Sequence, residues 1–173
     1  MKKVLLIFVL PLFFFVGCED EQLTNENEVA NTIEIVTNDI MDSNFYYNFV
    51  TQSIVDSTSI WHFSAKSKQV EFAGQLFGMP SIFFGDVYAQ LSDSTYSEVT
   101  IPPGQTSPWY QDNSVVEYGG EDEIISYNMT THVASIEKPT DVFIIYEYIG
   151  HTTYKVQFLD YTAGILSFQF FQL

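Results

Sequence analysis

The chain has 173 residues and a formal net charge of −16 at pH 7, from 6 basic and 22 acidic residues, and every basic residue is a lysine. Nucleic acid is an unexpected partner for such a chain, because phosphate binding requires a basic patch. Ion pairing with other anionic ligands is also hard to arrange. Aromatic residues make up 17% of the sequence, so we expect ligand affinity to come from apolar and aromatic surface.

The N-terminus predicts export. A basic Met1-Lys2-Lys3 precedes an apolar run that is shorter than the roughly 20 residues of a membrane-spanning helix, so we interpret residues 1–17 as a signal peptide. The run ends in Phe-Val-Gly-Cys18, which resembles a bacterial lipoprotein cleavage box and implies lipidation of Cys18. Cys18 is the only cysteine and can form no internal disulfide, which agrees with an anchor. The alternative is a plain signal peptide with an unmodified cysteine.

Residues 18–30 are polar and aperiodic, and we predict a flexible, acidic linker there. Its first residues, Glu19-Asp20-Glu21, resemble the surface-export signal of Bacteroidetes lipoproteins, which implies an outer-membrane protein exposed at the cell surface. An ordinary solvated tether is the alternative. The remaining residues, 31–173, are enough for a single β-rich domain with a real core.

Short segments rich in β-branched and aromatic residues follow one another through this domain, separated by turn residues, and no helical pattern stands out. We predict strands at residues 32–36, 45–50, 59–65, 70–72, 82–91, 115–118, 124–127 and 133–136.

Residues 141–173 predict three longer strands in a meander, with glycine at both breaks. In the middle strand Val156 and Phe158 alternate with Lys155 and Gln157, so we expect one dry and one wet face. Such a sheet needs a second layer over its apolar face. The sequence therefore predicts an all-β fold, an antiparallel two-layer, sandwich-like domain that ends in a three-stranded C-terminal meander.

Two segments depart from this succession of short predicted strands. Residues 74–86 combine glycine with large apolar side chains, and residues 101–110 contain three prolines before Trp109 and Tyr110. We expect the first segment to be an exposed apolar loop of the kind that binds ligands. The second is expected to be stiff and extended.

Two motifs of the domain are distinctive, Tyr127-Asn-Met-Thr-Thr-His-Val133 and Tyr154-Lys-Val-Gln-Phe-Leu-Asp-Tyr161. Together with Phe45–Phe49, Trp61–Ala65, Val87–Leu91 and Val142–Tyr146, and in this chain order, they resemble the HmuY family of haem-binding lipoproteins of Bacteroidetes. The resemblance implies an all-β fold without enzymatic activity. It also implies that haem is carried as a ligand and delivered to an outer-membrane receptor, with the iron ligated by histidine or methionine side chains.

Iron in a porphyrin needs an imidazole nitrogen or a thioether, with an apolar wall beside the ring. Met79 is the best-placed candidate for an axial ligand, and Met129 is the second; the alternative for each is plain core packing. The candidate porphyrin wall consists of aromatic residues in the two irregular segments: Phe77, Phe83, Phe84, Trp109 and Tyr110.

Three histidines remain. His132 matches the family's Thr-His pair, and we expect it to be structural, with its ring bonded to a neighbouring backbone group; it is a further, weaker ligand candidate. His62 is expected to be exposed or packed at a sheet edge, and His151 to be solvated in a hairpin turn.

Enzyme signatures such as Gly-x-Ser-x-Gly or His-Glu-x-x-His are absent from the sequence, and we expect no metal other than haem iron. A different class stays open, a glycan- or protein-binding accessory surface lipoprotein that uses Trp109 and Tyr110 as a stacking platform. The distance between Met79 and Met129 separates the two hypotheses. If they share no apolar cleft, the second is favoured.

Overall fold

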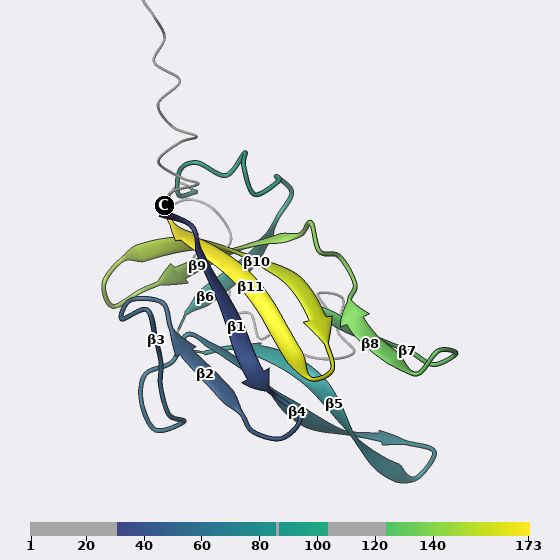
Figure 1. The fold of residues 1–173 in the computed structure, drawn as a ribbon. Coiled ribbons are helices and arrows are strands. Elements are labelled where there is room, and N and C mark those ends of the chain that lie inside the picture. The colour runs from purple at the N-terminus through teal and green to yellow at the C-terminus, as the bar shows by residue number, and fades with distance from the viewer. Residues whose placement is uncertain (1–30, 86, 104–123) are drawn as a thin grey trace, which may run out of the picture.

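The computed structural model describes residues 31–85, 87–103 and 124–173. Its regular structure is nearly all strand, and neighbouring strands pair antiparallel (Figure 1), which confirms the predicted fold class. Within these residues no helix is long and apolar enough to cross a membrane. The signal peptide, the linker with Cys18, the predicted strand at 115–118, and Trp109 and Tyr110 lie outside the described residues.

One layer is a five-stranded sheet. Its strands are, in spatial order, β1 (Ile33–Asp39), β11 (Ile165–Gln172), β10 (Thr152–Thr162), β9 (Val142–Glu147) and β6 (Tyr88–Ser92). Strands β9, β10 and β11 are consecutive in the chain and adjacent in the sheet, as the predicted meander requires.

The second layer is a four-stranded sheet, and a two-stranded ribbon lies beside it. The sheet has the order β3 (Ser53–Ile54), β2 (Phe45–Asn48), β4 (Phe63–Phe72) and β5 (Gln75–Phe84), and the ribbon joins β7 (Ile125–Asn128) to β8 (Val133–Ile136). The ribbon contacts β10 and β5, and Ile125 at its start is buried in the main core.

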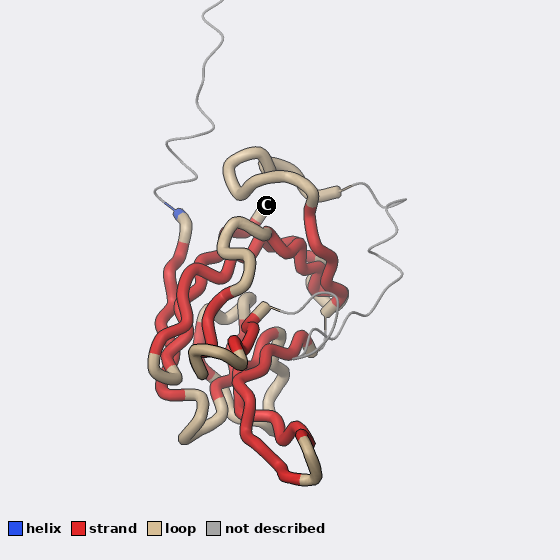
Figure 2. Tube along the Cα trace, turned by 90° about the vertical axis from the view of Figure 1, so that its right-hand side faces the viewer, coloured by secondary structure: helices blue, strands red, loops and turns tan. Residues whose placement is uncertain are grey.

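The β4–β5 hairpin corrects two predictions. Residues 74–86 do not form a loop; most of the segment is strand β5, which pairs without a register shift along the whole of β4. The predicted strands at 59–65 and 70–72 accordingly belong to one strand that begins at Phe63. The turn is Ala73-Gly74, with φ of 52° and 79°, the left-handed pair of a tight hairpin. The far half of this hairpin extends beyond the two sheets (Figures 1 and 2).

Aromatic side chains fill the space between the two sheets. The ring of Phe63 on β4 lies 4.8 Å from that of Phe168 on β11, measured between centroids, and the ring of Phe84 lies 6.3 Å from that of Phe158 on β10. Phe84 is 2% exposed. Its proposed role in a porphyrin wall is therefore wrong, because the pleat of β5 directs it into the core.

The predicted wet face of the meander is partly covered. Lys155 is fully buried, and its Nζ donates hydrogen bonds to the carbonyl oxygens of Tyr96 and Val99 at 2.6 and 2.8 Å. The ammonium also lies 4.3 Å from the centre of the Tyr96 ring. The segment after β6 thus covers this face, and a lysine in an alternating pattern did not mean solvent exposure.

Candidate functional site

A cavity lies between the far half of the β4–β5 hairpin and the β7–β8 ribbon. Its volume is about 280 Å³. It is lined by side chains from two arms, residues 70–79 of the β4–β5 hairpin and residues 127–132 of the β7–β8 ribbon: Val70, Phe72, Phe77, Met79, Tyr127, Met129 and His132. Both candidate axial ligands and the weaker candidate His132 therefore line the same apolar cavity.

The β4–β5 wall follows from strand register. Residues directly opposite each other in an antiparallel pair direct their side chains to the same face. Val70 is opposite Phe77, and Met79 is opposite Lys68, so these side chains share one face of the hairpin. Phe83 lies on this face too, nearer the sandwich, but it does not line the cavity. Of the three predicted wall phenylalanines, only Phe77 lines it.

The β7–β8 turn forms the opposite wall. The Oδ1 atom of Asn128 accepts hydrogen bonds from the backbone N–H groups of Thr130 and Thr131 at 2.9 and 3.0 Å. The N–H of His132 donates to the Asn128 carbonyl at 2.8 Å, and His132 has a left-handed φ of 57°. These bonds fix the short turn that carries Met129 and His132.

The ring of His132 is held by a side chain. Its Nδ1 lies 2.9 Å from the hydroxyl oxygen of Tyr127, so the expectation of a backbone partner is wrong. When one ring nitrogen of a histidine is hydrogen-bonded, the other nitrogen is the one that binds a metal. With Nδ1 engaged by Tyr127, Nε2 is the nitrogen of this ring that suits a metal.

The chemistry of the lining is soft and uncharged. Two thioethers and one imidazole are the metal-binding groups, and none of the described lining residues is acidic. Among the described residues, no group of three histidine, cysteine, aspartate or glutamate side chains is placed to hold a metal ion. Thioethers and imidazoles favour soft or borderline metals such as haem iron.

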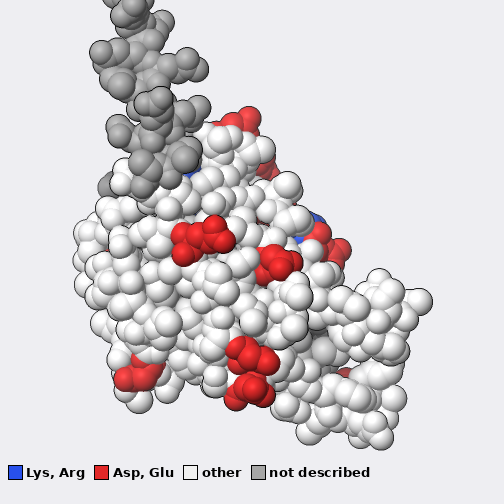
Figure 3. Space-filling model, in the orientation of Figure 1, with Lys and Arg blue, Asp and Glu red and all other residues white. Residues whose placement is uncertain are grey.

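The surface around the cavity is apolar. Phe72 is 59% exposed and Met129 is 54% exposed, and Phe77 and Val133 are exposed as well. In Figure 3, the two arms present a mostly uncharged surface, whereas acidic side chains cluster over the sandwich. Contiguous exposed apolar surface on a soluble domain marks an interaction site.

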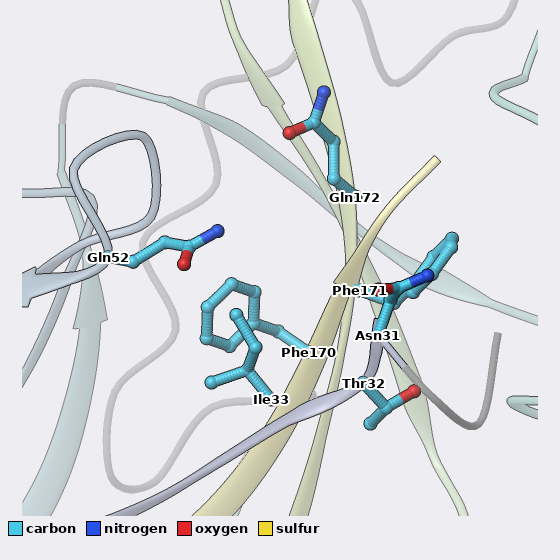
Figure 4. Close-up of a pocket in the computed structure, with 7 residues that line it drawn as sticks. All are labelled: Asn31, Thr32, Ile33, Gln52, Phe170, Phe171 and Gln172. Atoms are coloured by element: carbon cyan, nitrogen blue, oxygen red, sulfur yellow. The ribbon is translucent and has the colours of Figure 1, made fainter. Parts of the chain in front are cut away.

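A larger cavity, of about 480 Å³, has different chemistry. Gln52 faces Ile33 and Phe170 across it, and Gln172 lies at another side (Figure 4). Its described lining contains amide, hydroxyl and apolar side chains without a metal-binding group: Asn31, Thr32, Ile33, Gln52, Phe170, Phe171 and Gln172. It lacks the donors that an iron porphyrin needs.

His62 belongs to a third, smaller cavity of about 210 Å³, between the loop after β2 and the β9–β10 turn. The side chain is 2% exposed, and its Nδ1 accepts a hydrogen bond from the backbone N–H of Phe49 at 3.2 Å. The prediction of an exposed or edge-packed His62 is wrong, because the residue precedes β4 and its ring stacks on Phe49. His151 is exposed and lies in the β9–β10 turn, as predicted.

Sequence reasoning missed three lining residues: Val70, Phe72 and Tyr127. Val70 and Phe72 lie in a predicted strand, but residues 74–86 are predicted to form a loop, so the sequence does not place these two side chains beside Phe77 and Met79. The Ala73-Gly74 turn was the available signal. It makes β4 and β5 one hairpin and places Val70 beside Phe77.

Comparisons with known proteins give no relative for this chain: no family model, no curated protein and no solved structure matches it.

Proposed function

We propose that this protein is a haem-binding surface lipoprotein of the hemophore type, a divergent member of the HmuY family. It captures haem or a related porphyrin in the cavity between the β4–β5 hairpin and the β7–β8 turn. The observation that carries the proposal is that Met79 and Met129 line one apolar cavity together with His132. Methionines without a shared apolar cleft would have favoured the glycan- or protein-binding alternative.

The two thioethers come from opposite walls. Met79 belongs to β5 and Met129 to the β7–β8 turn, so a flat ligand can enter between them and receive one donor from each side. These two residues are the proposed axial ligands. His132, held by Tyr127, is the remaining donor and forms part of the wall. Exposed apolar side chains such as Phe72 and Phe77 cover the porphyrin ring and remove it from water.

The size of the cavity limits how the ligand lies. Pockets for small ligands enclose roughly 300–1,000 Å³, and this cavity of about 280 Å³ is slightly smaller than that range. A porphyrin bound here is therefore gripped at one part of its ring and keeps the rest outside. An exposed edge suits a carrier that passes its ligand to an outer-membrane receptor.

The remainder of the proposal concerns location and transfer. Lipidation of Cys18 anchors the protein in the outer membrane, and the acidic linker holds the domain away from the membrane on the cell surface. The protein catalyses no reaction. Haem is its cargo, and the site requires no other metal.

A titration with haem tests the proposal. Residues 18–173 with Cys18→Ser, which carry no lipid, are titrated with ferric and ferrous haem while the Soret band is followed. We expect a saturable shift that Met79→Leu weakens or alters. Met41→Leu is the matched control, because the end of the Met41 side chain lies near Gly78, on the opposite face of the same strand.

Absence of a saturable shift in both oxidation states would contradict the proposal. Glycan and protein-partner screens would then address the alternative of an accessory surface lipoprotein with the same β fold. An equal effect of Met79→Leu and Met41→Leu would keep haem binding but remove Met79 from the site.

A further inference from the structure

The few lysines of this acidic protein are unevenly placed. Four of the six lie beyond the predicted signal peptide and linker: Lys66, Lys68, Lys138 and Lys155. Lys155 is fully buried, and Lys138 follows β8 at the end of the ribbon opposite to His132. The two remaining lysines both belong to β4.

Lys66 and Lys68 lie on the face of the hairpin that carries the cavity wall. Lys68 is directly opposite Met79, and Lys66 is directly opposite Ser81. Opposite residues share a face, and so do residues two apart on a strand. Along this face of β4 the chain therefore has two lysines followed by two apolar lining residues, Val70 and Phe72.

Both lysines are partly removed from solvent. Each is half-buried, and the Nζ of Lys66 lies 4.4 Å from the centre of the Phe83 ring. Partial burial strengthens the attraction of an ammonium group for a carboxylate. The rest of the molecule has a large negative charge, which repels anions, so a local cationic group determines whether an anionic ligand is accepted here.

We propose that Lys68, assisted by Lys66, binds carboxylates just outside the cavity, on the same face of β4 as its lining, and makes the site selective for a tetrapyrrole with free propionate groups. The proposal rests on the proposed haem function. It adds an orientation: the iron lies near Met79, and the propionate edge points along β4 toward the sandwich. It also revises the expectation, drawn from net charge alone, that ion pairing with an anionic ligand is hard to arrange in this chain.

A pair of ligands tests the inference. Haem and its dimethyl ester share the ring and the iron, but only haem carries free carboxylates. The unlipidated chain described above is titrated with each in the ferric state. We expect haem to bind about tenfold more tightly than the ester, as one charge-assisted contact provides. Lys68→Gln should remove this difference by weakening haem binding while leaving the binding of the ester unchanged.

Three further variants complete the test. Lys68→Arg keeps the cation and should keep most of the preference for haem. Lys66→Gln should reduce the preference by about threefold, since Lys66 is two residue pairs further along the hairpin from Met79 than Lys68 is. Lys138→Gln, at the other end of the ribbon, should change nothing. Far-UV circular dichroism establishes that each variant is folded.

The outcomes separate the two proposals. If Lys68→Gln weakens haem and ester equally, or affects neither, Lys68 does not recognise carboxylates and the inference is overturned, while haem binding stands. If the unsubstituted chain binds neither ligand, the proposed function fails and the carboxylate site fails with it.

Discussion

Two hairpin turns of this protein share one local design and differ in their surroundings. Tyr127 near the end of β7 is followed by the β7–β8 turn, which ends with His132, and Tyr146 near the end of β9 is followed by the β9–β10 turn, which ends with His151. Each histidine has a left-handed φ, 57° and 55°. In each, the tyrosine hydroxyl is hydrogen-bonded to Nδ1 of the histidine five residues later.

The residue after each tyrosine completes the design. Asn128 accepts the N–H groups of the residues two and three positions later, and Glu147 does the same for Ile149 and Gly150. A bonded tyrosine–histidine pair is thus a feature of how these turns close. By itself it does not indicate a ligand site.

What distinguishes the two turns is what faces them. Beside the β9–β10 turn lie other tyrosines: Tyr88 stacks on Tyr146 and contacts Tyr148. Beside the β7–β8 turn lies the β4–β5 hairpin with Phe77 and Met79. The loop after β2 also faces the β9–β10 turn, around the smaller cavity, but the described lining there contains no thioether. The site is therefore made by the β4–β5 hairpin, which brings Met79 to the β7–β8 turn. The β9–β10 turn supplies a position-matched control for each residue of the first turn.

The largest expected effect comes from the first residue of each turn, which is Met129 in one and Tyr148 in the other. Met129→Leu removes a proposed iron ligand and keeps the apolar volume, so we expect haem affinity to fall by about 100-fold. Tyr148→Leu should leave the affinity unchanged. Both values come from Soret titrations. Equal affinities for the two variants would show that the comparison between the turns has no functional meaning.

The capping side chains should differ in stability. Glu147 is 3% exposed, and its two carboxylate oxygens each accept one N–H at 2.6 Å; Glu147→Ala should cost about 2 kcal/mol of unfolding free energy. Asn128 uses one neutral oxygen in an exposed turn, and Asn128→Ala should cost about 1 kcal/mol. Urea denaturation measures both values. A larger loss for Asn128→Ala would refute this ranking.

The two histidines should differ in their effect on haem affinity. His132→Ala removes a donor and part of the cavity wall, and we expect haem affinity to fall about tenfold. His151→Ala is the control, since His151 does not line the cavity, and it should bind haem like the unsubstituted chain. A normal affinity for His132→Ala would remove His132 from the site.

The smallest effect is expected at the tyrosines. Tyr127→Phe removes the hydroxyl that holds the His132 ring but keeps the apolar lining, and it should weaken haem binding about threefold. The predicted consequence disappears in the His132→Ala background, because there is no longer a ring to orient. Tyr146→Phe should have no effect on haem in either background. An effect of Tyr127→Phe that persists without His132 would contradict the positioning role.

The sequence predicted the fold better than it predicted which segments lie at the site. The meander could be predicted because its last two strands alternate apolar and polar residues and are separated by Ala163-Gly164, a turn with φ of 51° and 86°. The same dipeptide at Ala73-Gly74 makes the same turn, but the strand after it contains Gly78 and Pro80. Because glycine and proline are uncommon in strands, this segment does not look like a strand in the sequence. Pattern alone cannot show that Gly78 leaves space on β5 for Ser67 and Gln69 across the hairpin.

The candidate ligands were also predicted better from the sequence than the walls of the cavity. Met79 and Met129 were found from chemistry, since few side chains of this sequence can ligate iron. Phe84 was misassigned because neighbouring residues on a strand point to opposite faces, and the strand itself was not recognised. Lys155 was misassigned because the segment that covers it, around Tyr96 and Val99, is distant in sequence.

The central claim is that haem iron is held by a thioether from the β4–β5 hairpin in the cavity facing the β7–β8 turn. Iron-edge X-ray absorption on the haem complex tests it most directly, because sulfur and nitrogen neighbours of iron scatter differently. We predict sulfur in the first coordination shell of the unsubstituted protein and of Met41→Leu, and less sulfur in Met79→Leu. A shell of nitrogen and oxygen alone, the same in all three proteins, would contradict the account.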